Sequence, residues 1–117
     1  MPKVLIVEDD RTMVSLLATL LELDGFEVIP TTQAGDLEQN LRNDQPDLLI
    51  MDVFLTNGDG IELLRKVRSS SEFSKLPVIM TSGMDVEDQC LEAGANGFML
   101  KPYSPPDLLS MIRENLE

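Results

Sequence analysis

The chain has 117 residues, of which 43% are hydrophobic and 26% charged, and its net charge is -12 at pH 7. This length predicts one domain spanning 1–117 with a substantial core, and the acidic balance argues against a nucleic-acid or anionic-membrane surface, because both need clustered Lys and Arg. With no long apolar run, no signal-peptide pattern and a lone Cys90, we expect a cytoplasmic protein without a membrane span or a disulfide framework.

Apolar runs and turn signals predict an alternation of strands and helices in the first half of the chain. The expected elements are a strand at 4–7, a helix at 11–23, a strand at 26–29, a short helix from Ala34 to Leu41 and a strand at 48–52. Asp10 is suited to cap the first helix. The apolar stripe expected on that helix consists of Met13, Leu16, Leu17, Leu20 and Leu21.

The alternation continues in the second half. Its expected elements are a helix at 61–67, a strand at 78–82, a weak helix at 86–93, a strand at 97–100 and a helix from Pro105 to Leu116. Five strand–helix units favour an α/β fold with a parallel sheet covered by helices on both faces. We therefore expect a flavodoxin-like doubly wound sheet of five strands in the order 2-1-3-4-5.

Polar side chains follow four of these strands at the point where each strand ends. Glu8 and Asp9 follow the first strand, Asp52 ends the third, Ser82 ends the fourth and Lys101 follows the fifth. Because the carboxyl ends of parallel strands lie along one edge of the sheet, where ligands bind, these groups are expected to converge on one crevice.

Three carboxylates in one crevice need a positive partner. Two like charges about 4 Å apart repel by roughly 4 kcal/mol at an effective dielectric of about 20. Lys101 supplies one positive charge, and oxygen ligands without histidine favour magnesium over zinc. The chain has no histidine at all, so a phosphoryl group would have to come from another molecule and be accepted by a carboxylate. Taken singly, Glu8 and Asp9 also fit turn formation and helix capping.

Together these residues resemble the receiver domain of bacterial two-component response regulators, the chemotaxis-type regulators included. The resemblance covers nearly the whole chain and rests on Glu8-Asp9, Asp52, the turn Asn57-Gly58-Asp59-Gly60, Ser82, Phe98 and Lys101-Pro102. It implies that Asp52 is phosphorylated with the help of Mg²⁺, for which Mn²⁺ could substitute. The metal ligands implied are Glu8 through water, Asp9, Asp52 and the backbone carbonyl of Phe54.

The resemblance also implies roles for residues of the last two strands. Lys101 and Ser82 contact the phosphoryl group, although Thr81 is a competing hydroxyl, and Lys101-Pro102 is a cis peptide. Phe98 matches a switch aromatic whose ring turns inward as Ser82 moves toward the phosphate, and a buried core phenylalanine is the plainer interpretation. Departures are Thr56, where the family usually has proline, and a Ser82-to-Lys101 segment that is nearly one helical turn shorter than usual.

The function implied is two-component signal transduction by a phosphoacceptor switch rather than an enzyme. The donor would be a histidine kinase or histidine phosphotransfer protein, and the output a downstream protein target or a fused output domain. We expect slow self-dephosphorylation, because Phe54 and Met84 cannot hold a hydrolytic water by hydrogen bonds. The alternatives are a phosphorylation-independent binding module and a magnesium-dependent phosphohydrolase, which would need a substrate cap. Whether the chain is free-standing or part of a larger regulator is left open.

Overall fold

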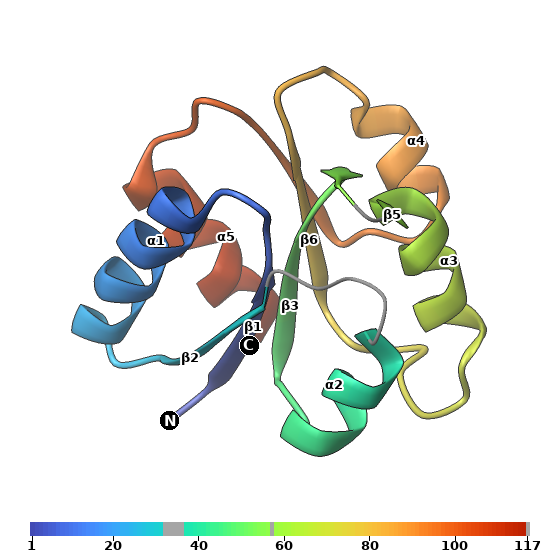
Figure 1. The fold of residues 1–117 in the computed structure, drawn as a ribbon, viewed down its shortest axis with the longest axis horizontal. Helices are drawn as coiled ribbons and strands as arrows, with labels where there is room; N and C mark the ends of the chain where they lie inside the picture. The colour runs from blue at the N-terminus through green and yellow to red at the C-terminus, as the bar shows by residue number, and fades with distance from the viewer. Residues whose placement is uncertain (32–36, 57, 117) are drawn as a thin grey trace.

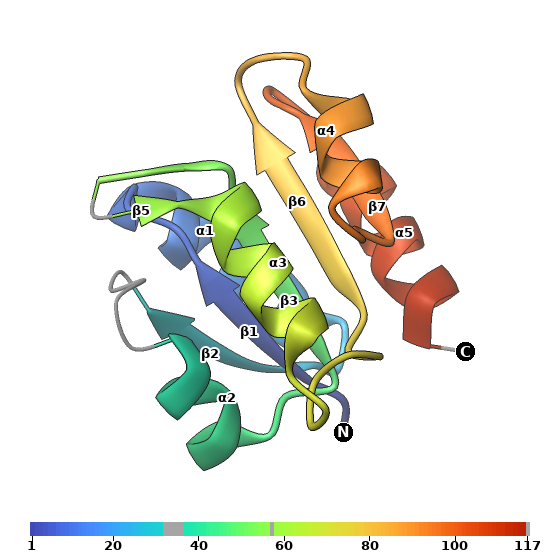
Figure 2. The same cartoon turned by 90° about the vertical axis from the view of Figure 1, so that its right-hand side faces the viewer.

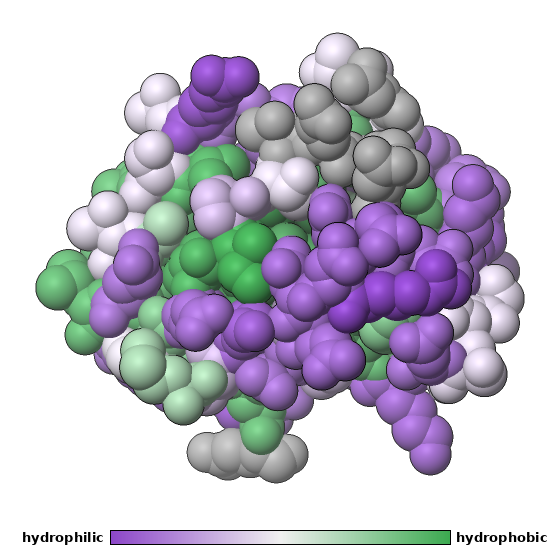
Figure 3. All heavy atoms as spheres, turned by 60° about the horizontal axis from the view of Figure 1, so that its bottom comes forward, coloured by the Kyte–Doolittle hydropathy of each residue, from purple (hydrophilic) through white to green (hydrophobic). Residues whose placement is uncertain are grey.

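The computed structural model describes residues 1–31, 37–56 and 58–116. The expected helix start at Ala34 and the turn residue Asn57 lie outside the described residues. Within the described ranges, no helix is long and apolar enough to cross a membrane. Hydrophilic residues predominate on the face shown in Figure 3, with apolar residues in smaller areas among them.

The main sheet is parallel and has the predicted topology. Its strands are β1 (Lys3–Val7), β2 (Glu27–Thr31), β3 (Leu48–Asp52), β6 (Val78–Ser82) and β7 (Gly97–Leu100). They lie in the order β2-β1-β3-β6-β7, which is the flavodoxin-like order 2-1-3-4-5 when the strands of this sheet are numbered along the chain. Every residue of β3 and β6 is buried, because helices cover both faces of the sheet (Figures 1 and 2).

Two helices, α1 (Arg11–Leu23) and α5 (Pro105–Leu116), cover one face of the sheet (Figure 1). Their buried side chains form one apolar cluster with alternate residues of the strands, which include Val4, Ile6, Leu48, Ile50 and Ile79. The alternation follows from the two-residue side-chain period of a strand. It also places Glu8 and Asp52, which continue the Val4-Ile6 and Leu48-Ile50 series, toward this face.

The helix α1 confirms the predicted bounds and cap but corrects the predicted stripe. The carboxylate of Asp10 accepts hydrogen bonds from the amides of Thr12 and Met13. Val14, Leu17 and Leu21 are the residues buried in this helix, whereas the side chain of Leu16, expected to face inward, is 57% exposed. Residues at positions i, i+3 and i+7 share a helix face, and Leu16 lies about 100° around the helix from Leu17.

The other face of the sheet is covered by α2 (Leu37–Asp44), α3 (Gly60–Ser69) and α4 (Glu87–Glu92). Their apolar residues pack against the strand residues of the opposite parity in a second cluster, which also contains Phe98. The helix α4 is only six residues long. The short segment noted between Ser82 and Lys101 therefore contains a short helix.

Two short strands were not predicted. After β3 the chain forms a small antiparallel pair, β4 (Phe54–Leu55) and β5 (Gly58–Asp59), in the region where the sequence indicated only a turn. Strands of two residues are too short to show a hydrophobic period, so the sequence carries no signal for them. Asp59 then caps α3 by accepting a hydrogen bond from the amide of Ile61 at 2.9 Å.

Candidate functional site

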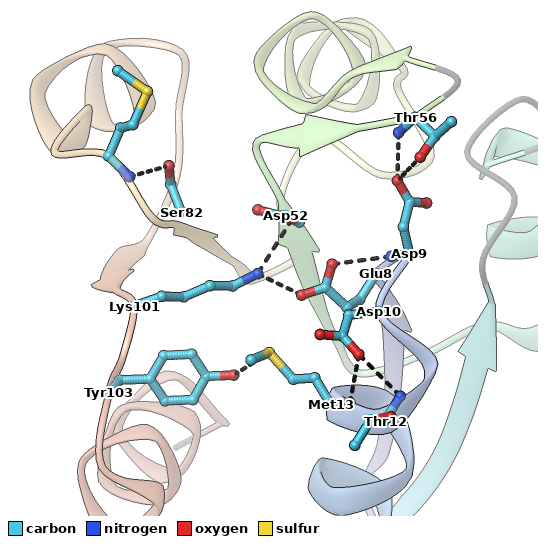
Figure 4. A network of polar contacts seen from close by, with 11 residues as sticks. Glu8, Asp9, Asp10, Thr12, Met13, Asp52, Thr56, Ser82, Lys101 and Tyr103 are labelled. Carbon is cyan, nitrogen blue, oxygen red and sulfur yellow. Dashed lines mark hydrogen bonds and ion pairs between the residues drawn. The ribbon is translucent and has the colours of Figure 1, made fainter.

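The carboxyl ends of the central strands bring an ammonium and two carboxylates together. The Nζ atom of Lys101 lies 2.5 Å from Oε1 of Glu8 and 3.3 Å from Oδ2 of Asp52. The side chains of Glu8 and Asp52 are almost fully buried, and the side chain of Lys101 is 20% exposed. In Figure 4 the three side chains, from β3 and the segments that follow β1 and β7, point toward one another. This part of the predicted convergence is present in the structure.

The unequal surroundings of these groups shift their proton affinities. Burial, followed by the Glu8 carboxylate beside it, raises the pKa of Asp52 to about 6, although Lys101 acts in the opposite direction. Burial alone would lower the pKa of Lys101, but the contacts with Glu8 and Asp52 outweigh burial and raise it. The pocket thus holds two carboxylates against one ammonium, a balance that favours either a proton or a further cation near Asp52.

The third predicted carboxylate points elsewhere. Asp9 is adjacent to Glu8 in the chain, but its Oδ2 atom accepts hydrogen bonds from both the backbone amide and the hydroxyl of Thr56, the latter at 2.7 Å. Figure 4 shows Asp9 directed toward Thr56 and away from Lys101. The sequence grouped Asp9 with Glu8 and Asp52, and the structure does not bring its carboxylate into that group.

The hydroxyl residues at the end of β6 lie on opposite faces of the sheet, as strand alternation requires. Ser82 continues the series of Met80 and lies on the face that holds Phe98, while Thr81 lies in register with Asp52. Both are buried. The Ser82 hydroxyl accepts a hydrogen bond from the amide of Met84 at 2.9 Å, and its backbone carbonyl accepts one from the amide of Lys101 at 2.7 Å.

Three other parts of the predicted site are Phe98, the Lys101-Pro102 peptide and Phe54. Phe98 is already buried, with 9% of its surface exposed, and packs in the core cluster on the α3 and α4 side. The inward position expected after phosphorylation is thus the one present here. The Lys101-Pro102 peptide bond is cis, the isomer that the resemblance implies. Phe54, whose carbonyl is a predicted metal ligand, has an exposed side chain at the start of β4.

Gly60 explains how the chain turns away from Asp52 so tightly. A Cβ atom at this position would lie 2.3 Å from the backbone oxygen of Asp52 and 2.9 Å from Cα of Val53. The amide of Gly60 also donates a 2.7 Å hydrogen bond to the carbonyl of Val53. Only glycine permits this approach, so the glycine in the predicted turn serves to hold α3 against the end of β3.

Sequence reasoning did not single out Tyr103. Its hydroxyl donates to the sulfur of Met13 at 3.8 Å. Its contact with Met13 and its packing against the α1 and α5 cluster place this phenol on the α1 side of the sheet. Burial, together with the charges of Glu8 and Asp52, raises the pKa of Tyr103 to about 12. The aromatic residue two positions after Lys101 was the available signal, but nothing local indicates which residue it would pack against.

The carboxylates of Glu8, Asp9 and Asp52 are of the type that binds a hard divalent cation, but they are not oriented toward one point in this structure. All side-chain candidates are carboxylates, which magnesium prefers. Among residues 1–31, 37–56 and 58–116, however, no three acidic, histidine or cysteine side chains are close enough together to hold a metal ion. A cation bound by Asp9 and Asp52, with Glu8 acting through water, would require the carboxylate of Asp9 to turn from Thr56.

Comparison with known proteins assigns the family. The family model described as the response regulator receiver domain matches residues 4–113. The chain belongs to this family. Receiver domains are phosphoacceptor switches of two-component signalling, so the functional class expected from the sequence is confirmed. As a family they generally bind Mg²⁺ for phosphorylation and act with histidine kinases and output domains.

The relatives of this receiver domain include transcription regulators. It is 36% identical over 119 residues to the phosphate regulon transcriptional regulatory protein PhoB of Rhizobium meliloti (strain 1021), covering 99% of this chain and 52% of that protein. It is 40% identical over 118 residues to the KDP operon transcriptional regulatory protein KdpE of Escherichia coli (strain K12), covering 97% of this chain and 50% of that protein. The chain thus spans about half the length of these curated relatives.

Solved structures agree with the receiver fold. A putative response regulator from Chloroflexus aurantiacus J-10-fl has a TM-score of 0.92 at 33% identity, covering 99% of this chain and 98% of that one. The BeF3-activated N-terminal receiver domain of RstA from Klebsiella pneumoniae has a TM-score of 0.90 at 28% identity, covering 98% of both chains. The predicted fold class is confirmed.

Proposed function

We propose that residues 1–117 form one receiver domain in which Asp52 accepts a phosphoryl group. The observation that carries this proposal is the position of Asp52, nearly buried at the end of the central strand β3, with the Lys101 ammonium 3.3 Å from its carboxylate. A buried acid with a raised pKa and a specific charged partner is a recurrent feature of functional sites. Among the described residues, the capping acids Asp10 and Asp59 have no such partner, and both accept hydrogen bonds from amides at helix starts.

In the proposed transfer, a carboxylate oxygen of Asp52 forms a bond to phosphorus. The bond from phosphorus to the donor's imidazole nitrogen breaks, and that nitrogen keeps the electron pair and takes up a proton. Because this chain contains no histidine, a phosphohistidine donor must be another molecule. The donor proposed from the family is a histidine kinase or a histidine phosphotransfer protein. Lys101 is proposed to leave Glu8 and pair with a phosphoryl oxygen as a point charge.

Magnesium is the proposed cofactor, and manganese is expected to substitute for it. Asp9, Asp52 and the carbonyl of Phe54 would hold it, with Glu8 acting through water. When bound, the cation neutralises negative charge on the transferred group. The residues of this chain then orient that group: Ser82 exchanges its contact with the Met84 amide for a phosphoryl oxygen. Phe98, expected to turn inward with this movement, is already buried before it and keeps its inward position.

The domain is proposed to act as a cytoplasmic signalling switch and not as an enzyme with turnover. Its output would pass to a downstream protein target or to a fused output domain, in keeping with relatives twice its length that are named as transcription regulators. Nucleic-acid and membrane contacts are not proposed for this domain, since its net charge is -12 and both surfaces attract cationic proteins.

The experiment is intact-mass measurement after incubation with acetyl phosphate, with and without Mg²⁺. Wild type should gain one labile phosphoryl group only when Mg²⁺ is present, and Asp52→Asn should gain none. The matched control is Asp10→Asn, which keeps an N-cap residue on α1 and should be phosphorylated like wild type. Absence of any gain in wild type would contradict the proposal and favour a phosphorylation-independent binding module. Equal gain in Asp52→Asn would move the acceptor to another residue.

A further inference from the structure

We propose that Thr56 is a positioning residue for cation binding: it holds the Asp9 carboxylate outside the Asp52 pocket until a metal ion draws it in. The inference rests on the proposed function, because it concerns the affinity of the same magnesium site. Its consequence is that Thr56 weakens cation binding and stabilises the cation-free protein, two effects of opposite sign from one side chain.

The contact is made by two donors of one residue to one oxygen. Oδ2 of Asp9 accepts the backbone amide of Thr56 and also its hydroxyl, which lies 2.7 Å away. Hydrogen bonds to an ionised carboxylate are stronger than those between neutral groups. Thr56 follows β4 directly, and Figure 4 shows its side chain on the far side of Asp9 from Lys101.

The adjacent acid is directed the opposite way. Oε1 of Glu8 contacts Lys101 at 2.5 Å, and Oε2 of Glu8 accepts the backbone amide of Asp9 at 3.0 Å. Glu8 therefore occupies the pocket while Asp9 faces the loop. This arrangement limits the pocket to two carboxylates per ammonium, which reduces repulsion among like charges. A cation reverses that advantage, since it attracts a third carboxylate that Thr56 must release.

The residue type at position 56 determines the strength of this restraint. Serine would keep both donors, valine would keep the amide while removing the hydroxyl at similar volume, and proline would remove the amide as well. Because Asp9 and Thr56 are accessible to solvent, water competes for both groups and the effect should be severalfold rather than many orders of magnitude.

The test is an NMR titration of the metal-free protein with Mg²⁺, following amide signals of Gly60 and Lys101, for wild type, Thr56→Val and Thr56→Ser. Thr56→Val should lower the dissociation constant for Mg²⁺ by roughly three- to fivefold, the fold-change expected from one hydrogen bond of typical net strength. Thr56→Ser should restore the wild-type value. Urea unfolding in EDTA should show Thr56→Val to be slightly less stable than wild type.

A matched control is Thr19→Val, which removes a hydroxyl that donates to the carbonyl of Ser15 at 3.0 Å within α1 and should leave the Mg²⁺ affinity unchanged. Unchanged or weaker Mg²⁺ binding by Thr56→Val would overturn the inference while leaving the metal site in place, because a purely structural role lowers stability without raising affinity. If wild type and Asp52→Asn responded identically to Mg²⁺, the metal site itself would be refuted and the inference with it.

Discussion

At the scale of single residues, the carboxylate of Asp52 is the group whose ionisation the fold opposes most clearly. Burial is the main cause and the Glu8 carboxylate adds to it, so that the pKa of Asp52 rises from its ordinary 3.8 to about 6 although Lys101 is near. Between these two values the folded protein holds a proton that the unfolded chain has released. The free energy of unfolding therefore falls as the pH rises through this interval.

Asp52→Asn removes this titration and should flatten the pH dependence. In EDTA, the free energy of unfolding of the variant minus that of wild type should increase by on the order of 2 kcal/mol between about pH 4 and about pH 7. Urea unfolding at a series of pH values measures this difference. The control is Thr19→Val, which removes no titratable group and should give a curve parallel to that of wild type. Parallel curves for wild type and Asp52→Asn would show that the folded environment does not disfavour the Asp52 charge.

The types of the site residues were readable from the sequence, but their partners were not. Glu8, Asp52 and Lys101 each follow an apolar run, which is a local signal. The separation of Asp9 from that group depends on Thr56, which is 47 residues away in the chain. No periodicity of the sequence encodes such a contact, because it arises from the relative positions of two loops.

At the scale of elements, helix ends were predicted best where a cap residue marks them. Asp10 caps α1, which begins at Arg11 as expected. Gly25 follows the end of α1 with φ at +93°, a conformation that favours glycine. The pair β4 and β5 has no comparable signal. The helix α4, which lacks a side-chain cap, is shorter than the expected 86–93.

Arg68 joins the end of α3 to the loop between α4 and β7. Its guanidinium donates to the carbonyl of Gly94 at 2.9 Å and to the side-chain oxygen of Asn96 at 2.8 Å. Burial lowers the pKa of Arg68. Gly94 has φ at +109°, and a Cβ atom there would lie 2.9 Å from Cγ of Arg68. Glycine at position 94 therefore leaves room for the Arg68 side chain and adopts a backbone conformation that other residues rarely do.

Arg68→Met should keep the apolar stem and lose these hydrogen bonds. The expected destabilisation is about 1–3 kcal/mol, measured by urea unfolding, with faster amide exchange between α4 and β7. The control Arg65→Met removes an exposed ion pair with Glu62 at 2.6 Å and should change stability by less than about 1 kcal/mol. Equal losses for the two variants would mean that Arg68 contributes no more than a surface charge.

At the scale of the whole molecule, the order of strands decides which residues could influence the lifetime of a phosphorylated Asp52. Because β3 and β6 are neighbours, Phe54 and Met84 follow strand ends that lie side by side. Their side chains are 55% and 62% exposed, and neither can hold an attacking water by a hydrogen bond.

Phosphorylated wild type is therefore expected to lose its phosphoryl group slowly, and Met84→Gln to lose it faster, by up to roughly tenfold, because an amide can orient water. The measurement is the decay of the phosphorylated mass after removal of the phosphodonor. Leu23→Gln, at an 81% exposed position at the end of α1, serves as the control and should decay like wild type. Rapid loss from wild type itself would contradict the expectation.

The sequence by itself determined the fold class, the order of the main-sheet strands and of the helices, and the set of polar residues at the strand ends. These follow from local patterns: apolar runs, caps, turns and the rule that parallel strands end at one edge. Only the tertiary structure decided which of these polar side chains contact one another. Lys101 reaches Glu8 across 93 residues of sequence, Phe98 is buried, and Asp9 turns to Thr56. The reason is physical: charge and hydrogen-bond energies depend on distances of a few ångströms between segments, which the packing of β1, β3 and β7 sets and no single segment contains.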